Sequence, residues 1–264
     1  MIDIHTHILP GIDDGSPDLE TSLNYLQQMA AEGVTDVVCT SHYIRNQFHN
    51  TLQIRQEKYT LLQDELHKRQ IPIKVHLAAE VYLEPEILDD IKKEKMNIGE
   101  TSYVLVETDF TGFPVNLKEL LFDLVRAGYK PILAHPERYS NIKKNPEIAE
   151  EFMHRNVLLQ LNASSLLGNY GRASAKAAWK LLELGYCHFV ASDCHCRSGE
   201  YVLPQVAELI SKKFDEYTSQ LLTKQNPEKI LKNENIDTFY LENLDLTKNS
   251  FWNKFKKIVS KIKP

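Results

Sequence analysis

The sequence predicts an α/β fold, a distorted (β/α)7 barrel with a metal site at the carboxyl ends of its strands. Seven short apolar runs alternate with segments of helical periodicity, which is the pattern of parallel strands joined by crossover helices. Six of these runs end in residues that bind metals. The strands of a parallel barrel end around one mouth, so these residues are expected to converge there. An open doubly wound sheet is the competitor, but such a sheet collects ligands at one switch point.

The predicted strands are short and buried. They cover residues 2–4, 37–39, 75–79, 103–106, 131–134, 157–161 and 189–191. The polar residues after them are His5 and His7, His42, Glu80, Glu107, His135 with Arg138, Asn162, and Asp193 with His195. On an extended strand the His-x-His pair points to one face, because side chains alternate with period two.

Helices are predicted between the strands. Apolar periodicity places them over residues 17–32, 53–69, 116–127, 146–155, 172–184 and 204–222. Ser16 is expected to cap the first helix, with Pro17 in the first helical position and Gly33 ending the run.

Composition favours one cytoplasmic domain over residues 1–245. The chain has 264 residues, a formal charge of -5 and four cysteines, which fits a reduced protein without a disulfide scaffold. The charge gives no reason to expect nucleic-acid binding. The first strand leaves no room for a signal segment, and no apolar run reaches the roughly 20 residues that span a bilayer.

Residues 246–264 form a separate basic tail. It contains six lysines, no acidic residue, and an apolar stripe of Phe251, Phe255, Ile258, Val259 and Ile262 at helical spacing. Such a helix can lie on an anionic membrane surface. A helix packed on the barrel, or a partly disordered tail, explains the same pattern.

The candidate ligands predict a multi-metal hydrolase. They are His5, His7, Asp13 or Asp14, His42, Glu80, Glu107, His135, Asp193 and His195. Mixed imidazole and carboxylate ligands suit manganese, zinc or iron(II). Coordination lowers the pKa of water towards 7, so a metal-bound hydroxide can attack a phosphate ester.

At this point the sequence resembles a known family. The motifs MIDIHTHILPGIDDGSPDLE, TSHY, AAEVYLE, VLVETDF, AHPERY, LQLNASSLLGNYG and VASDCH occur in order over about residues 1–232. They resemble the PHP (polymerase and histidinol phosphatase) superfamily, and most closely its bacterial metal-dependent protein-tyrosine phosphatases of capsule and exopolysaccharide loci.

The resemblance implies a site for three divalent ions, often manganese. One ion would be held by His5, His7, Glu80 and Asp193, a second by Glu80, Glu107 and His135, and a third by Asp14, His42 and His195. Because Asp13 and Asp14 are adjacent, either of them can be the aspartate that binds the third ion.

Two arginines are candidates for phosphate binding. Arg138 matches the arginine of the family that contacts phosphate, and its guanidinium suits bidentate capture of phosphoryl oxygens. The family carries a second arginine after the Asp-x-His motif. Arg197 follows that motif here but stands closer to the histidine, so whether it substitutes is left open.

The resemblance implies hydrolysis of phosphotyrosine on a protein, with a bacterial tyrosine kinase as partner. The alternatives are a small-molecule phosphatase such as a histidinol phosphatase, an amidohydrolase and a non-catalytic adaptor. An amidohydrolase would not need Asp14, His42 and His195, and an adaptor would lack a ligand.

The cysteines suggest a rival mechanism that we reject. Cys39 and Arg45 fit the C-x5-R spacing of cysteine-dependent tyrosine phosphatases. The segment has no glycine to open the loop, and Cys39 ends an apolar strand, where a thiol packs as a small hydrophobe. Cys194 and Cys196 flank His195 and are expected to be buried or half-exposed thiols, with zinc binding as the alternative.

Overall fold

The computed structural model describes residues 1–197, 199 and 201–238 of the chain. The predicted basic tail over residues 246–264 lies outside these residues, so the amphipathic helix stays a prediction. Within the described part of the chain, every helix falls short of the length and apolar character needed to cross a lipid bilayer.

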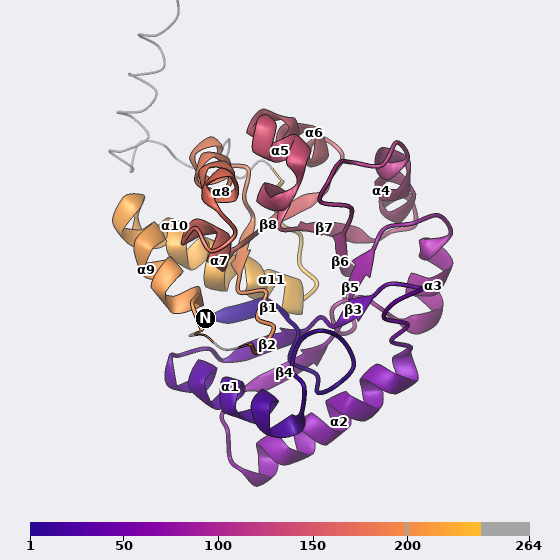
Figure 1. The fold of residues 1–264 in the computed structure, drawn as a ribbon, viewed down its shortest axis with the longest axis vertical. Helices are drawn as coiled ribbons and strands as arrows, with labels where there is room; N and C mark the ends of the chain where they lie inside the picture. The colour runs from indigo at the N-terminus through magenta and orange to yellow at the C-terminus, as the bar shows by residue number, and fades with distance from the viewer. Residues whose placement is uncertain (198, 200, 239–264) are drawn as a thin grey trace, which may run out of the picture.

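The predicted α/β fold with parallel strands is confirmed, with nine strands in the described residues. They are β1 (Ile2–Thr6), β2 (Asp36–Cys39), β3 (His42–Tyr43), β4 (Lys74–Leu77), β5 (Glu80–Tyr82), β6 (Tyr103–Glu107), β7 (Lys130–Ala134), β8 (Leu158–Asn162) and β9 (Phe189–Ala191). They pair in parallel as β1-β2-β4 and as β3-β5-β6-β7-β8-β9. Figure 1 shows the helices arranged around the strands.

The strand count exceeds the predicted seven because two strand runs are interrupted. The run after β2 restarts as β3, and the run after β4 restarts as β5. The buried guanidinium of Arg55 donates a hydrogen bond to the Ala78 carbonyl at 2.9 Å, and the Ala79 amide donates one to the Met96 carbonyl. These bonds divert the backbone between β4 and β5, so the ladder restarts in a second sheet.

Backbone hydrogen bonds also link the first strand with the segment after the last. The Asp193 amide donates to the His5 carbonyl at 2.9 Å, and the His7 amide donates to the Cys194 carbonyl at 2.8 Å. The polar residues after β1 and β9 therefore lie side by side, although about 190 positions separate them in the sequence.

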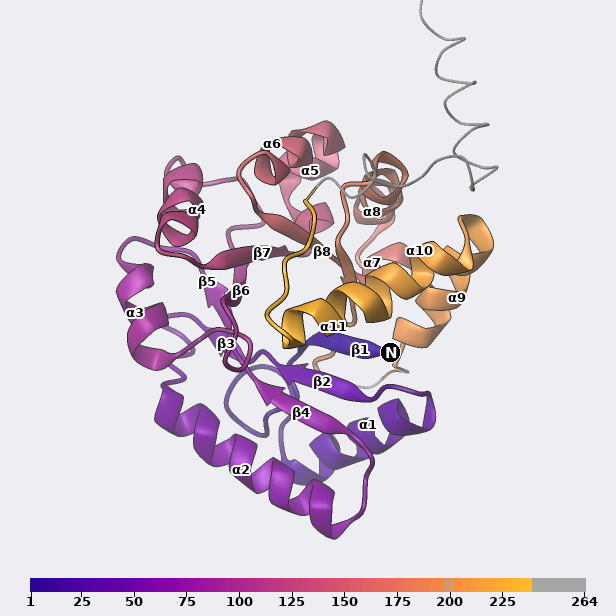
Figure 2. The ribbon, with the colours of Figure 1, turned by 180° about the vertical axis from the view of Figure 1, so that it is seen from behind.

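Side chains on the strands divide between two apolar clusters. Tyr103 and Leu105 of β6 belong to an inner cluster with residues of β1, β7, β8 and β9, whereas Val104 and Val106 pack against helices. This follows from the alternation of side chains along a strand. Ile230 and its neighbours cover the inner cluster at the amino ends of the strands, where Figure 2 shows the last helix crossing.

Most predicted helices are present, and several short ones were not predicted. They are α1 (Leu19–Ala31), α2 (Leu52–Lys68), α3 (Ile87–Glu94), α4 (Leu117–Arg126), α5 (Ser140–Lys144), α6 (Ala149–Met153), α7 (Ala163–Leu166), α8 (Arg172–Leu184), α9 (Leu203–Lys213), α10 (Glu216–Gln220) and α11 (Asn226–Leu231). Short helical turns η1 (Pro136–Arg138), η2 (Pro146–Ile148) and η3 (Leu221–Gln225) complete the set.

Two helix predictions need correction. The cap of α1 is Asp18 rather than Ser16, because the Asp18 carboxylate accepts from the Thr21 amide at 2.8 Å. The predicted helix over residues 204–222 is divided near Phe214, where Asp215 caps a new helix by accepting from the Thr218 amide at 2.7 Å.

Candidate metal centre and phosphate site

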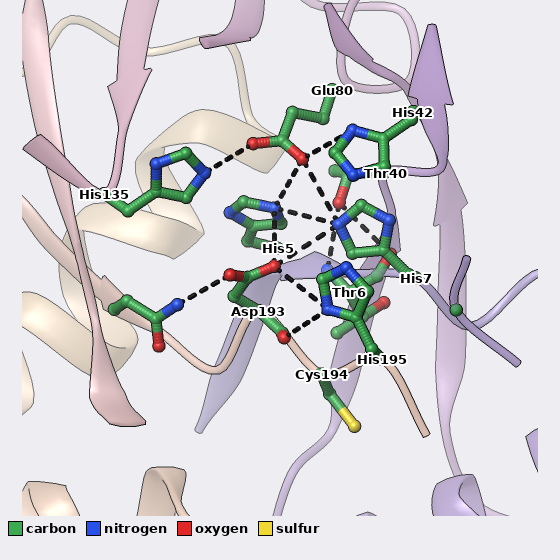
Figure 3. Close-up of polar contacts among 12 residues, drawn as sticks. His5, Thr6, His7, Thr40, His42, Glu80, His135, Asp193, Cys194 and His195 are labelled. Carbon is green, nitrogen blue, oxygen red and sulfur yellow. Dashed lines mark hydrogen bonds and ion pairs between the residues drawn. The ribbon is translucent and has the colours of Figure 1, made fainter. Parts of the chain in front are cut away.

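The predicted site residues converge at the carboxyl ends of the strands (Figure 3). Their potential ligand atoms form three overlapping groups: His5, His7, Glu80 and Asp193; His42, Glu80 and Glu107; and His7, Asp14, His42 and His195. His135 joins them through its Nε2, which lies 2.8 Å from Glu80 Oε1. A cavity of about 500 Å³ opens onto this cluster and is also lined by Arg138.

The two histidines of β1 are held with their Nε2 atoms facing inward. His5 Nδ1 lies 2.7 Å from the Gln160 side-chain oxygen, and His7 Nδ1 lies 2.8 Å from Asp13 Oδ2. Both partners accept, so Nδ1 carries a proton in each ring and Nε2 is the nitrogen that faces the cluster. Those Nε2 atoms lie 3.2 Å apart, which suits a shared cation.

Two buried carboxylates stand opposite these imidazoles. Glu80 Oε2 lies 3.2 Å and Asp193 Oδ1 lies 3.3 Å from His5 Nε2. Burial opposes the charged form of His5, but Glu80 and Asp193 outweigh it and raise the pKa of His5 to about 9. Burial likewise disfavours ionised Glu80, yet the neighbouring histidines hold its pKa well below the usual range. The buried imidazolium and carboxylate charges therefore stabilise one another.

Glu80 also belongs to the ligand group of His42 and Glu107, because strand pairing places it beside His42. The register of β3 on β5 sets His42 directly beside Glu80. His42 Nδ1 lies 3.2 Å from Glu80 Oε2 and 3.0 Å from Glu107 Oε1. One carboxylate thus borders two of the three groups, as a bridging ligand does.

Asp14, rather than Asp13, faces the third group. Asp14 Oδ1 lies 3.5 Å from His42 Nε2 and 3.4 Å from His195 Nε2. Contact with His195 is the main cause of the lowered pKa of Asp14. Asp13 instead orients His7 and accepts from the His42 amide at 2.9 Å. The two neighbouring aspartates therefore have different tasks.

The turn that presents these aspartates requires a glycine. A Cβ on Gly15 would lie 2.2 Å from the His7 carbonyl oxygen, and that oxygen also accepts from the Ser16 amide at 2.9 Å. Any side chain at position 15 would push the aspartate loop away from His7.

Two candidate ligands have strained backbones. His135 and Asp193 lie in the left-handed region with φ of 36° and 54°, which is unfavourable for residues with a Cβ. Such strain persists where the surroundings impose it, commonly at functional sites. Here it aims both side chains into the cluster.

The residues fit divalent metal ions. Glu80 Oε2, Asp193 Oδ1, His42 Nδ1 and His135 Nδ1 are buried and have no hydrogen-bond partner among the described residues. Unsatisfied buried polar atoms are costly, and three of these four, all except His135 Nδ1, border the same cluster as the Nε2 atoms of His5 and His7. A cation at the centre of the cluster would satisfy those three.

Arg138 lies at the edge of the cavity between two aromatic rings. Its guanidinium carbon is 4.4 Å from the ring centre of Phe110 and 4.2 Å from that of Tyr170. Its Nη1 lies 3.3 Å from Asp193 Oδ2. These two ring contacts restrain the guanidinium, whose N–H groups along its edge donate hydrogen bonds.

The second arginine, Arg197, contacts a candidate ligand. Its Nη2 donates to Asp14 Oδ2 at 2.7 Å and to the Asp14 carbonyl at 3.0 Å. Its side chain lines the same cavity as Arg138, and whether it binds phosphate stays a prediction.

The cysteine arrangement has the wrong geometry for a thiolate loop. Cys39 is fully buried, and burial raises the pKa of its thiol. Arg45 donates to Asp90 at 2.6 Å instead of facing that thiol. Cys194 and Cys196 belong to none of the ligand groups found among the described residues.

Several residues that contact the site were not among the predicted ligands. Gln160 and Asn162 both contact candidate ligands, and the Asn162 amide donates to Asp193 Oδ2 at 2.6 Å. Their spacing of two in β8 was a usable signal, since alternate side chains share a face. Phe110 and Tyr170 lie outside the strands and carried no such signal.

Comparison with known proteins gives the family. The model of the family described as "Capsular polysaccharide synthesis, CpsB/CapC" matches residues 1–232. The chain belongs to the CpsB/CapC family. It is 31% identical over 239 residues to the putative tyrosine-protein phosphatase CapC of Staphylococcus aureus, covering 89% of this chain and 93% of that relative. It is 30% identical over 238 residues to the tyrosine-protein phosphatase YwqE of Bacillus subtilis, with the same coverage.

Solved structures agree with this CpsB/CapC membership. The structure described as YwqE from Bacillus subtilis and CpsB from Streptococcus pneumoniae, "unique metal-dependent tyrosine phosphatases", matches with a TM-score of 0.84. It is 31% identical and covers 89% of this chain and 96% of that one. A histidinol phosphate phosphatase from Lactococcus lactis matches with a TM-score of 0.51 at 14% identity, which shows a shared fold alone.

Proposed function

We propose that this chain is a metal-dependent protein-tyrosine phosphatase. The observation that carries the proposal is the convergence of nine imidazole and carboxylate side chains in one cluster, seven of which line the same cavity as Arg138. CpsB/CapC membership and relatives named as tyrosine-protein phosphatases support phosphotyrosine as the substrate.

The site residues are assigned as ligands of three divalent ions. His5, His7, Glu80 and Asp193 would hold the first, Glu80, Glu107 and His135 the second, and Asp14, His42 and His195 the third. Manganese is the proposed metal, with iron and zinc as alternatives, because the ligands are imidazoles and carboxylates without a thiolate. When bound, such ions lower the pKa of water and neutralise phosphoryl oxygens.

The chain's own residues bind and orient the substrate. Arg138 donates from its edge to two oxygens of the phosphoryl group, and Phe110 and Tyr170 prevent the guanidinium from turning away. Gln160 and Asp13 keep His5 and His7 in the required tautomers. No cysteine takes part, so no phosphocysteine forms.

The proposed physiological partner is a bacterial tyrosine kinase that controls capsule or exopolysaccharide synthesis. The family description supports the capsule role. We also retain, as proposals, a cytoplasmic location and a division into a catalytic domain over residues 1–245 and a basic tail that contacts anionic membrane surfaces weakly.

The decisive experiment compares two substrates. Metal-loaded protein is assayed on a phosphotyrosine peptide and on histidinol phosphate, with release of inorganic phosphate as the measurement. A kcat/KM at least about tenfold higher for the peptide is expected. A preference for histidinol phosphate would replace the proposal with a small-molecule phosphatase.

A further inference from the structure

A second cavity lies between α5, η2 and α8. Its volume is about 370 Å³, and its lining is Lys143, Lys144, Pro146, Lys176, Ala177, Trp179, Lys180 and Glu183. Four of these eight residues are lysines. Figures 1 and 2 both show α5 and α8 as neighbours on the outside of the strands.

The lysines of this cavity have no acidic partners. Within the described part of the chain, no carboxylate forms an ion pair with any of the four lysines. The single acidic residue in the lining, Glu183, is engaged elsewhere, because Lys213 Nζ lies 3.2 Å from its carboxylate. The cavity therefore keeps an excess of positive charge.

The arrangement of the lysines is unfavourable for the protein alone. Lys176 and Lys180 are separated by four positions on α8, and like charges at this spacing destabilise a helix. Lys143 and Lys180 are half-buried and line the cavity. An anionic occupant would offset this repulsion.

The two helices that line this cavity begin shortly after catalytic-site residues in the sequence. α5 starts two residues after Arg138, and α8 starts two residues after Tyr170. Since an α-helix rises about 1.5 Å per residue, Lys143 and Lys176 lie on the order of 10 Å from those two residues. An extended peptide advances about 3.3 Å per residue and would reach the cavity about three to five residues from its phosphotyrosine.

We propose that this lysine-lined cavity binds an acidic segment of the substrate protein, about three to five residues from the phosphotyrosine. The inference rests on the proposed phosphatase function and adds a recognition surface to it. Charge complementarity and proximity to Arg138 select this occupant. Trp179 provides an apolar wall for the aliphatic part of an acidic side chain.

The test uses two phosphotyrosine peptides that differ only in charge. One carries glutamates at positions three to five on each side of the phosphotyrosine, and its twin carries glutamines there. The metal-loaded full chain should hydrolyse the acidic peptide with a kcat/KM about tenfold higher, mainly through a lower KM, and the preference should fall as salt is added. Equal values for the two peptides would overturn the inference.

Matched variants locate the effect. Lys143→Glu with Lys180→Glu should abolish the preference, while Lys92→Glu with Lys232→Glu changes net charge equally at exposed positions outside the cavity and should keep it. Turnover of para-nitrophenyl phosphate should stay near the original value in both. If the distant pair abolished the preference as fully, the effect would belong to overall charge and not to the cavity. Should the glutamate pair fail to fold, Lys143→Ala with Lys180→Ala replaces it.

A binding measurement separates this inference from the phosphatase proposal. Fluorescence anisotropy compares unphosphorylated acidic and neutral peptides binding to the same proteins. Tighter binding of the acidic peptide that is lost in the cavity variant supports the cavity even if no peptide is hydrolysed. Hydrolysis without any charge preference retains the phosphatase and rejects the cavity.

Discussion

The guanidinium carbon of Arg138 lies 4.2 Å from the ring centre of Tyr170. This contact restricts the arginine proposed to bind phosphate, so its loss should reduce catalysis without removing metal. We expect Tyr170→Ala to lower kcat/KM on a phosphotyrosine peptide about five- to tenfold, since one cation–π contact contributes about 1 kcal/mol. Tyr170→Phe keeps the ring and is the control. Identical kinetics for the alanine and phenylalanine variants would show that the ring does not position Arg138.

Replacing Arg138 itself should lower kcat/KM more than replacing Tyr170. Arg138→Ala removes direct donors to the phosphoryl group and should lower kcat/KM about 100-fold or more. Its metal content, measured by mass spectrometry of the dialysed protein, should stay near normal. A variant with full activity would place Arg138 outside the site.

Glu80→Gln should affect metal and activity together. Glu80 borders two ligand groups and is fully buried, so the substitution removes a charge that both groups share. We expect fewer bound ions per chain, and a smaller rise in unfolding temperature on adding manganese. Arg138→Ala is the matched comparison, because it should lose activity with its metal retained. Normal metal content in Glu80→Gln would argue against bridging.

Chelation and thiol replacement distinguish the two phosphatase mechanisms. A chelator should abolish activity and manganese should restore it, whereas Cys39→Ala should retain most of the activity. The reason is that Cys39 is buried and its thiol pKa is raised, so little thiolate exists at neutral pH. A folded, metal-loaded Cys39→Ala protein without activity would overturn the metal mechanism.

His188 should make stability depend on pH. Its Nδ1 accepts from the Leu159 amide at 3.0 Å and its Nε2 donates to the Thr238 carbonyl at 2.9 Å, an arrangement that only the neutral ring satisfies. Burial lowers the pKa of His188 from 6.5 to about 4. Between these values the unfolded chain binds more protons, so the free energy of unfolding should fall with falling pH by up to about 3 kcal/mol.

Denaturant unfolding of metal-free protein between pH 7 and pH 4 measures this effect. His188→Asn should flatten part of the pH dependence, whereas His67→Asn on the exposed face of α2 should leave it unchanged. Parallel curves for His188→Asn and the original protein would show that His188 does not contribute.

The positions of the ligands could be predicted from sequence because they depend on strand ends. His5 and Asp193 each follow an apolar run, and parallel strands bring such ends together whatever the details of packing. The interruption at Ala78 could not be predicted, because it depends on a hydrogen bond from Arg55, which lies 23 positions earlier. Likewise, the choice between Asp13 and Asp14 depends on the fold of one turn around Gly15, which residue spacing does not determine.

The basic tail should be dispensable for chemistry. A chain ending at residue 245 should keep its kcat/KM on a soluble phosphotyrosine peptide, because every proposed ligand lies earlier in the sequence. Sedimentation with anionic vesicles at low and physiological salt tests the proposed membrane contact. If the full-length and shortened proteins sediment equally, the tail has no such role.

The hydrogen bond from the Asp193 amide to the His5 carbonyl has a consequence for biosynthesis. His5 is translated first, but Asp193, which completes its ligand group, is translated only after most of the chain. The ligand groups that need Asp193 or His195 therefore cannot be complete on the nascent chain until its last strand has been translated. Loading of the full set of ions must follow that point, so full activity is expected only once the domain is finished.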